Sequence, residues 1–270
     1  MEFLLSNFIH QIEAIYPLDL AEEWDPVGLH FGNLNSTVSR IMTTLDVTES
    51  VVEEAISQNV DTIVAHHPLI FSSIKRLDDG QMNIELYRTL LSNRINVYAM
   101  HTNVDRQQNG MNDWLANRLG LINVRDLANQ PLNTEMTPEL GRVGDLPEAL
   151  SHNELYQHIL KQLGAPYLQV VNPSTDLYHR IAIVGGSAYE SIEAAIKCGA
   201  DAFITGDVTY HKVLEASTLP ITTIDAGHFI EQCFIKEMAQ ILHHLVPEHV
   251  TIIESQTNRD PRQLIIRKDV

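Results

Sequence analysis

The sequence of 270 residues predicts an α/β protein built as two α/β domains with mixed, largely parallel sheets. Two observations support this fold class. Short apolar runs rich in Ile and Val alternate with segments whose apolar residues recur every third or fourth position, which is the order of strands and helices around a parallel sheet. In addition, a polar stretch with several Pro and Gly residues separates two such series, as expected between domains.

The first series begins with a strand expected over residues 41–45 and continues into a helix whose expected N-cap is Thr48. The helix that follows residue 110 is expected to end at Gly120, a residue type common just after helices. The series therefore predicts βαβα order. The remaining elements are a strand ending at residue 65, a helix over 82–93, a strand over 95–100 and the helix over 111–119.

The second series also alternates between helices and strands. Gly185 and Gly186 precede one of its helices and are expected to allow close packing of strand against helix rather than to bind an anion. A further helical pattern starts after His228. The expected elements are helices over 154–163 and 189–197 and strands over 180–184, 202–205 and 221–224.

The polar stretch between Leu127 and Leu150 is interpreted as the crossing between the domains, because prolines and glycines interrupt both kinds of periodicity. We expect residues 1–127 together with residues 226–270 to form a metal-binding α/β domain. Residues 128–225 are expected to form the second α/β domain.

Composition narrows the function classes. The formal net charge is −17, the isoelectric point is near 5.0 and no basic run occurs, so we expect neither nucleic acid nor an anionic membrane surface as a partner. The N-terminal residues lack the pattern of a secretory signal, and no apolar run approaches the roughly 20 residues that span a bilayer. Only two cysteines occur, which does not indicate a disulfide framework. A cytoplasmic protein is therefore expected.

A histidine pair, His66-His67, follows the apolar residues 63–65 and precedes Pro68. Neighbouring residues at the end of a strand point in roughly opposite directions, so the two imidazoles are better placed to bind two different metal ions than to bind one together. Without further ligands, such a pair would equally be a structural feature. The prediction of a metal site therefore depends on donors elsewhere in the chain.

Further donors follow two other predicted strands. Asp105 lies shortly after the strand over 95–100, His228 follows the strand over 221–224, and Glu231 lies about one helical turn later. Because loops at the carboxyl ends of strands converge on one crevice, we expect these side chains to meet the histidine pair.

Counting the donors favours two ions. A catalytic zinc ion uses about three protein ligands, and five candidate donors are present, so a dinuclear site with ions about 3.5–4 Å apart and hydrolytic chemistry is expected. The donors are imidazoles and carboxylates without thiolates, so Zn, Mn, Fe, Ni and Co are all admissible.

Five ordered motifs span nearly the whole chain: EEWDPVGL at 22–29, HHPLIF at 66–71, HTNVD at 101–105, GADAFITGDVTYH at 199–211 and DAGHFIE at 225–231. In these motifs the sequence resembles the family of GTP cyclohydrolase 1 type 2 homologues, also called NIF-three-like proteins. The resemblance implies two α/β domains and a homohexamer, described as a trimer of dimers, with metal sites facing an internal cavity. It also implies two divalent metal ions per subunit, with Glu231 as the bridge and with the ligands His66, His67, Asp105, His228 and Glu231.

The sequence departs from the family pattern at two places. Pro26 stands where the family often has asparagine, and Arg106-Gln107-Gln108 replaces small residues after the aspartate of the HTNVD motif. The entrance of the pocket is therefore expected to differ from that of other members.

The resemblance further implies a dinuclear, divalent-metal-dependent hydrolase acting on a small molecule such as GTP or another nucleotide. In that reaction, water activated by the metals opens the imidazole ring of guanine, and His101 and His211 are the groups expected to relay protons. From the residues alone, Asp207 and His211 are more readily interpreted as a helix cap and a surface residue. The cations expected to offset phosphate charge are Lys75, Arg76, Arg106 and Arg180.

Two other function classes stay open. The first is a non-catalytic metal-binding or regulatory hexamer, for which a closed coordination shell would be typical. The second is a nucleotide phosphoesterase, which would release inorganic phosphate instead of the formate expected from ring opening.

Overall fold

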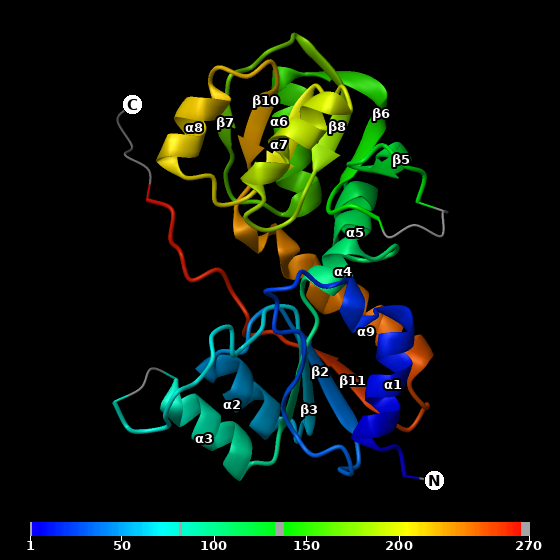
Figure 1. Cartoon of the computed structure of the whole chain (residues 1–270), viewed down its shortest axis with the longest axis vertical. Coiled ribbons are helices and arrows are strands. Elements are labelled where there is room, and N and C mark those ends of the chain that lie inside the picture. Colours follow the sequence, from blue (N-terminus) through cyan, green and yellow to red (C-terminus); the bar gives the residue numbers. More distant parts are fainter. Residues whose placement is uncertain (1, 81–82, 133–137, 266–270) are drawn as a thin grey trace.

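The computed structural model describes residues 2–80, 83–132 and 138–265, which form two mixed sheets joined by a layer of helices (Figure 1). One sheet lies towards each end of the long axis in this view. Between them lie α4 (Thr102–Arg106), α5 (Met111–Arg118) and α9 (Cys233–Leu245). The predicted α/β class with mixed sheets is confirmed.

The first sheet has five strands in the order β1-β4-β3-β2-β11, and only β1 is antiparallel to its neighbour. α2 (Glu49–Ser57) and α3 (Ile84–Ser92) cover one face, and α1 (Leu5–Ile15) and α9 cover the other. The strands are β1 Gly28–Phe31, β2 Arg40–Thr44, β3 Thr62–Ala65, β4 Asn96–Ala99 and β11 Thr251–Glu254.

The second sheet has six strands in the order β5-β6-β8-β9-β10-β7, and β8, β9 and β10 are parallel. α6 (His152–Leu163) covers one face, and α7 (Ile192–Lys197) and α8 (Tyr210–Ala216) cover the other. The strands are β5 Ile122–Asp126, β6 Arg142–Ser151, β7 Gln169–Val171, β8 Leu177–Ile183, β9 Ala202–Thr205 and β10 Thr222–Asp225. Three short 3-10 helices complete the described fold: η1 Leu18–Leu20, η2 Tyr189–Ser191 and η3 His228–Gln232.

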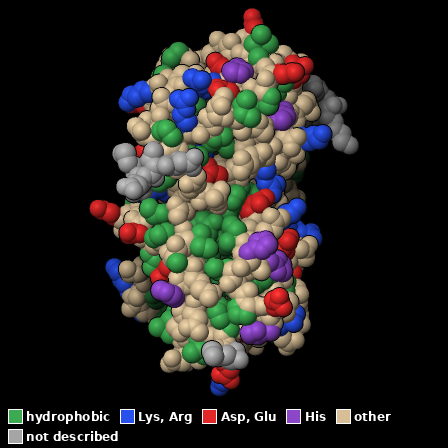
Figure 2. All heavy atoms as spheres, turned by 90° about the vertical axis from the view of Figure 1, so that its right-hand side faces the viewer, with side chains coloured by type: hydrophobic (Ala, Val, Ile, Leu, Met, Phe, Trp, Pro, Cys, Tyr) green, Lys and Arg blue, Asp and Glu red, His purple; other side chains and the backbone are tan. Residues whose placement is uncertain are grey.

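Alternation along the strands divides the core between the two faces of each sheet. In β3, Ile63 packs in the cluster under α2 and α3, whereas Val64 packs in the cluster under the middle helices; in β9, Phe203 and Ile204 alternate in the same way. The middle cluster extends without interruption from α1 through α9 and α5 to α6, so both sheets share it. On the face shown in Figure 2, hydrophobic side chains gather near mid-height.

Each predicted helix and strand has a counterpart in the structure, although several ends differ. The Thr48 cap is confirmed, because its hydroxyl accepts a hydrogen bond from the Val51 N–H at 3.3 Å. The helix expected over 82–93 begins at Ile84, and Met82 lies outside the described residues. None of the helices in the described ranges is both long and apolar enough to cross a lipid bilayer.

The expected crossing between the domains is wrong in part. Its last part, residues 142–150, belongs to β6, a strand in the interior of the second sheet, while residues 133–137 of the crossing lie outside the described residues. Pro147 fits in β6 because the pairing with β8 is irregular between Asp145 and Leu150, so its missing N–H interrupts no regular ladder. β5 also belongs to the second sheet although it ends at residue 126. The domain boundary at residue 127 stays a proposal. In the structure the chain passes from the first sheet to the second before β5.

Candidate metal centre

The candidate ligands follow three strands, two of them in the first sheet and one in the second. His66 and His67 directly follow β3, and Asp105 lies in α4 after β4 of the same sheet. His228 and Glu231 lie in η3, after β10 of the second sheet. The crevice expected at one sheet therefore lies between the carboxyl ends of two sheets.

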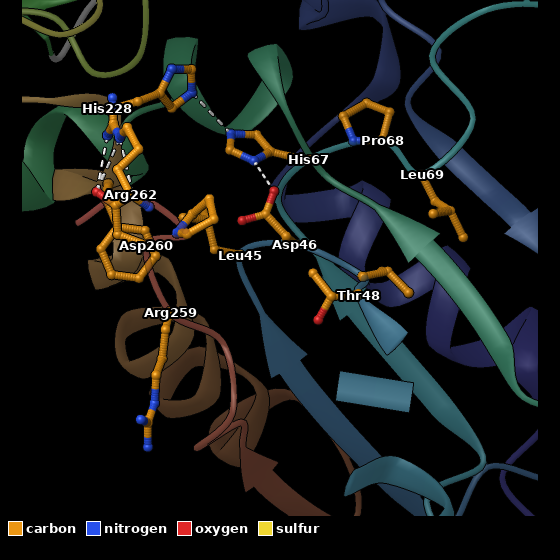
Figure 3. A pocket seen from close by; sticks show the side chains of 13 residues that line it. Leu45, Asp46, Thr48, His67, Pro68, Leu69, His228, Arg259, Asp260 and Arg262 are labelled. Atoms are coloured by element: carbon orange, nitrogen blue, oxygen red, sulfur yellow. Dashed lines mark hydrogen bonds and ion pairs between the residues drawn. The ribbon is translucent and has the colours of Figure 1, made fainter. Parts of the chain in front are cut away.

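One group of donors consists of His67, His228 and one oxygen of Glu231. The Nε2 atoms of the two imidazoles are 3.2 Å apart (Figure 3). Glu231 Oε2 lies 3.2 Å from His67 Nε2 and 3.1 Å from His228 Nε2. Ligand atoms around a tetrahedral ion with bonds of about 2.0–2.1 Å are separated by roughly 3.3–3.4 Å. This nearly equilateral triangle therefore fits three ligands of one ion.

A second group uses the other oxygen of Glu231. His66 Nε2 lies 3.7 Å from Glu231 Oε1 and 3.5 Å from Asp105 Oδ1. His66 Nε2 and Asp105 Oδ1 are both buried without a hydrogen-bond partner. Buried polar atoms are nearly always satisfied, and two such atoms that face one another suit a cation between them. The donor chemistry of this group therefore also fits a metal ion.

Every imidazole of the cluster has its Nδ1 hydrogen-bonded away from the centre. The Nδ1 of His66 must donate, because its partner is a carbonyl, so the neutral ring presents an unprotonated Nε2 to the cluster. Such outer partners orient ligating histidines and increase their basicity. The partners are the Met100 carbonyl for His66 at 2.8 Å, Asp46 for His67 at 2.7 Å, Asp25 for His101 at 3.0 Å and Asp207 for His228 at 2.9 Å.

The electrostatics of the centre reflect charges that are buried close together. Burial alone would lower the pKa of His67, but hydrogen bonds with Asp46 and Glu231 raise it to about 10. The hydrogen bond with Glu231 raises the pKa of His228 to about 9. Burial opposes ionisation of Glu231, yet the surrounding histidines hold its pKa well below the usual value. Burial and the charge of Glu231 raise the pKa of Asp105 to about 8. The raised pKa values of His67, His228 and Asp105 favour bound protons, which offset the negative charge of the carboxylates as a bound cation would.

Gly185 and Gly186 make room for the shared carboxylate. A Cβ atom would lie 2.8 Å from Glu231 Oε1 at Gly185 and 3.0 Å from it at Gly186, whose φ is +66°. The Gly185 N–H donates to Asn112 Oδ1 at 2.9 Å, and Asn112 Nδ2 donates to the Asp105 carbonyl at 2.9 Å. The close packing expected of these glycines thus includes the candidate metal ligand itself.

The two histidines expected to relay protons lie in different places. His101 is at the centre: one of its ring nitrogens lies within 4.8 Å of donor atoms of His66 and His67. His211 is exposed on α8, and it lines neither of the two cavities beside the centre. Asp207 is not the cap of α8, where the N-cap is Thr209; it binds His228 instead.

Sequence reasoning named Asp207 only as a helix cap and gave no role to Asp46 or Asp25, the other two aspartates that hold the histidines. Asp46 and Asp207 each lie two residues after a strand, which is the same kind of position as that of the predicted ligands. That placement was a usable signal. Asp25 lies in a turn before β1, and no local pattern connects it to His101.

Two cavities flank the centre and share His67, Pro68 and His228. The first has a volume of about 430 Å³ and contains Asp105, Glu231, aromatic side chains and the Gly185–Gly186 turn in its walls. The second has a volume of about 510 Å³ and extends to the C-terminal segment 259–262 (Figure 3). His67 and His228 therefore line both cavities, Asp105 and Glu231 line the smaller one, and the buried His66 lines neither.

Most cations expected near a phosphate lie elsewhere. Arg106 forms an ion pair with Glu22 and donates to the Leu20 carbonyl at 3.1 Å. These contacts account for an arginine at this position, where other family members commonly have a small residue. Arg180 forms an ion pair with Asp145 at 2.9 Å in the second sheet. Lys75 and Arg76 line a separate surface cavity.

Arg259 and Arg262 are the arginines that line the larger cavity, and sequence reasoning missed them. The Arg262 guanidinium contacts Asp260 (Figure 3). It also donates to Asp207 at 2.9 Å, so it helps to hold the aspartate that orients His228. Arg259 and Arg262 lie far from the other motifs in the sequence, and no sequence pattern connects them with the site.

The chain is similar over nearly its whole length to proteins of one family. The sequence model of the family described as Duf34/NIF3 (NGG1p interacting factor 3) matches residues 3–261. A protein of Clostridium acetobutylicum named GTP cyclohydrolase 1 type 2 homolog is 33% identical over 97% of this chain and 98% of its own length. A protein of Streptococcus pneumoniae with the same name is also 33% identical, over 96% of this chain and 98% of its own length.

Solved structures show the same fold. A Bacillus cereus protein described as related to NIF3 superposes with a TM-score of 0.91 at 26% identity and covers 98% of this chain and 100% of its own. Reduced HcgD from Methanocaldococcus jannaschii superposes with a TM-score of 0.78 at 29% identity and covers 94% of this chain and 98% of its own.

Proposed function

The chain belongs to the Duf34/NIF3 family, and on that premise we propose that it is a dinuclear, divalent-metal-dependent hydrolase of a nucleotide or a related small molecule. The observation that carries the proposal is the position of Glu231, whose two oxygens face two separate groups of donors. The name of the curated relatives supports GTP as the first substrate to test, with opening of the guanine imidazole ring as the reaction.

The proposed ligands divide between two ions per subunit. His66 and Asp105 would hold one ion, His67 and His228 would hold the other, and Glu231 would bridge them. Two ions held in this way lower the pKa of bound water and stabilise the negative charge that develops during hydrolysis. Zn, Mn, Fe, Ni and Co all suit these donors.

The remaining roles belong to residues around the ligands. Asp46 and Asp207 keep their histidines in the tautomer that presents Nε2 to the centre. We assign proton transfer to His101, because Asp25 orients it and it lines the smaller cavity, whereas His211 does not. Metal analysis of His101→Gln tests this role: retained metal with slowed turnover supports proton transfer, and lost metal identifies His101 as a sixth ligand.

The test of the proposed function is restoration of activity to stripped protein. Metal-free protein is reloaded with each of the five candidate metals, and loss of GTP and release of formate are followed. We expect formate from the loaded protein and none from Glu231→Ala. The hydrolase proposal fails if every loaded form leaves GTP untouched while Glu231→Ala changes metal content alone; a regulatory metal-binding hexamer would then be supported.

A nucleotide phosphoesterase is the second candidate, because Arg259 and Arg262 line a cavity at the centre and suit a phosphate group. Release of inorganic phosphate without formate would identify it. From the family resemblance we also propose a homohexamer arranged as a trimer of dimers and a cytoplasmic location. Sedimentation of the purified protein tests the first of these.

A further inference from the structure

Two large aromatic side chains are exposed at the smaller cavity. Trp24 and Phe71 each have 58% of their surface exposed, whereas the other tryptophan, Trp114, is 7% exposed in the core. The rings of Trp24 and Phe71 have centroids 5.8 Å apart, and Trp24 packs edge-on against His101 at 6.1 Å. Exposed neighbouring aromatics are typical of binding surfaces rather than of packing. Trp24 and Phe71 are therefore candidates for ligand contact rather than for core packing.

The backbone that carries Trp24 is firmly held. The buried Asp25 carboxylate accepts hydrogen bonds from His101 Nδ1 at 3.0 Å and from the Thr102 N–H at 2.9 Å. The Glu22 N–H donates to the Thr102 hydroxyl at 2.9 Å. Arg106 adds an ion pair with Glu22, so the turn is attached to α4 at several points. The exposed ring thus stands on a rigid support, which reduces the entropy lost when a ligand binds.

The cavity beside these rings suits a flat ligand. Its volume of about 430 Å³ lies within the range of roughly 300–1,000 Å³ that is usual for small-molecule sites. Gly185 and Gly186 contribute backbone without side chains to its wall, and Asp105 and Glu231 lie in the same cavity. An aromatic wall next to a cluster of metal-type donors therefore offers stacking and polar contacts to one molecule.

We propose that Trp24 and Phe71 form a stacking subsite for the planar heteroaromatic ring of a ligand that reaches the candidate metal centre. The proposal rests on the proposed function only in taking that ligand to be the substrate. Stacking on aromatic side chains accepts any nucleobase, because every base has a π face. Guanosine, which has no phosphate, is therefore a sufficient probe.

The first experiment uses the metal-loaded full chain with Trp114→Phe, which leaves Trp24 as the sole tryptophan. Guanosine and GTP at millimolar concentration are expected to quench its fluorescence saturably, and ribose 5-phosphate, which lacks an aromatic ring, is expected to leave it unchanged. No quenching by either guanine compound, or equal quenching by ribose 5-phosphate, overturns the proposal.

The second experiment measures guanosine binding calorimetrically to otherwise unmodified protein. Trp24→Leu should weaken binding on the order of 5- to 150-fold, and Trp24→Phe should retain most of it. Both variants should keep the metal content of the unmodified protein. Unchanged affinity of Trp24→Leu overturns the proposal. So does a shift of Trp24→Leu to a smaller oligomer by sedimentation, since the rings would then pack between subunits.

The two proposals can fail separately. If guanosine binding depends on Trp24 while no loaded form turns GTP over, the stacking subsite stands and the hydrolase proposal fails. If GTP is hydrolysed with equal KM by Trp24→Leu and the unmodified protein, the hydrolase stands and the subsite fails.

Discussion

Two buried clusters of charged side chains differ in how completely their polar atoms are satisfied. The Arg142 guanidinium is fully buried, forms an ion pair with Asp113 and donates to backbone carbonyls of residues 106, 107, 139 and 141. In the candidate metal centre, His66 Nε2 and Asp105 Oδ1 are also buried but have no hydrogen-bond partner. The polar atoms of the first cluster are satisfied within the chain, whereas these two atoms of the second have no partner and suit a cation.

The complete cluster lies next to the incomplete one. Arg142 projects from β6 of the second sheet, and one of the carbonyls it binds belongs to Arg106, the residue after Asp105. It therefore holds the end of α4 against the second sheet. A structural ion pair and a candidate binding site are thus adjacent. Substitution in the ion pair should lower stability and leave metal content unchanged, whereas substitution in the binding site should lower metal content.

The largest effect is expected from Glu231→Gln, which removes the charge that both groups of donors share. Metal affinity should fall on the order of 1,000-fold or more, beyond the roughly 10- to 100-fold cost of changing an outer partner. Elemental analysis after gel filtration measures it. The control is Glu237→Gln in α9, where the half-buried carboxylate pairs with Arg118 outside the candidate centre. Retention of both ions by Glu231→Gln would contradict the bridging role.

Arg142→Met should break the complete cluster and leave the metal centre occupied. Removing one partner of a buried pair leaves Asp113 uncompensated and should lower the free energy of unfolding by about 3–5 kcal/mol. Urea denaturation measures this loss, and metal content of the folded fraction should be unchanged. The double variant Arg142→Met, Asp113→Leu should recover part of the stability. A loss under about 1 kcal/mol would show that the pair is dispensable.

Metal affinity should increase with pH. The pKa values of about 10 for His67 and about 9 for His228 mean that both rings are protonated at neutral pH when no cation is bound. An ion at these ligands must displace one proton from each, so its affinity should increase up to about 100-fold per pH unit between about pH 6 and 8. Competition with a chelator across this range measures the slope. An affinity independent of pH would show that the rings bind no displaceable protons.

The smallest effect is expected from Asp207→Asn. This change keeps the size of the side chain but weakens the hydrogen bond that orients His228, so metal affinity should fall about 10- to 100-fold. Asp176→Asn, at an exposed position, serves as the control and should have no effect. Equal affinities of the two variants would remove Asp207 from the ligand support.

Most of the regular fold could be predicted because it depends on local patterns. Residues 202–205 form β9 as expected, and Thr48 caps α2 as its position before an amphipathic segment indicates. β6 was not predictable in the same way, because Pro147 and Gly144 are typical of loops. It is a strand because β5 and β8 pair with it on both sides, and such pairing between distant segments leaves no local signal.

The candidate donors could be named from the sequence because each one follows an apolar strand, and loops after strands converge at carboxyl ends. Which of these donors form each group could not be predicted. Glu231 faces both groups because β10 belongs to the second sheet and the Gly185–Gly186 turn leaves room for its carboxylate. The assignment of five donors to two ions stays a prediction, to which the distances now give specific partners.

The sequence by itself determined the α/β class, most helices and strands, and the imidazole and carboxylate types gathered at strand ends, because these follow from periodicity and from residue chemistry. Only the tertiary structure decided which donors meet, which aspartates orient the histidines, and that Trp24 lies exposed beside them. These features depend on how two sheets face each other across a shared helical core, and contacts between residues far apart in the chain are set by packing rather than by local pattern.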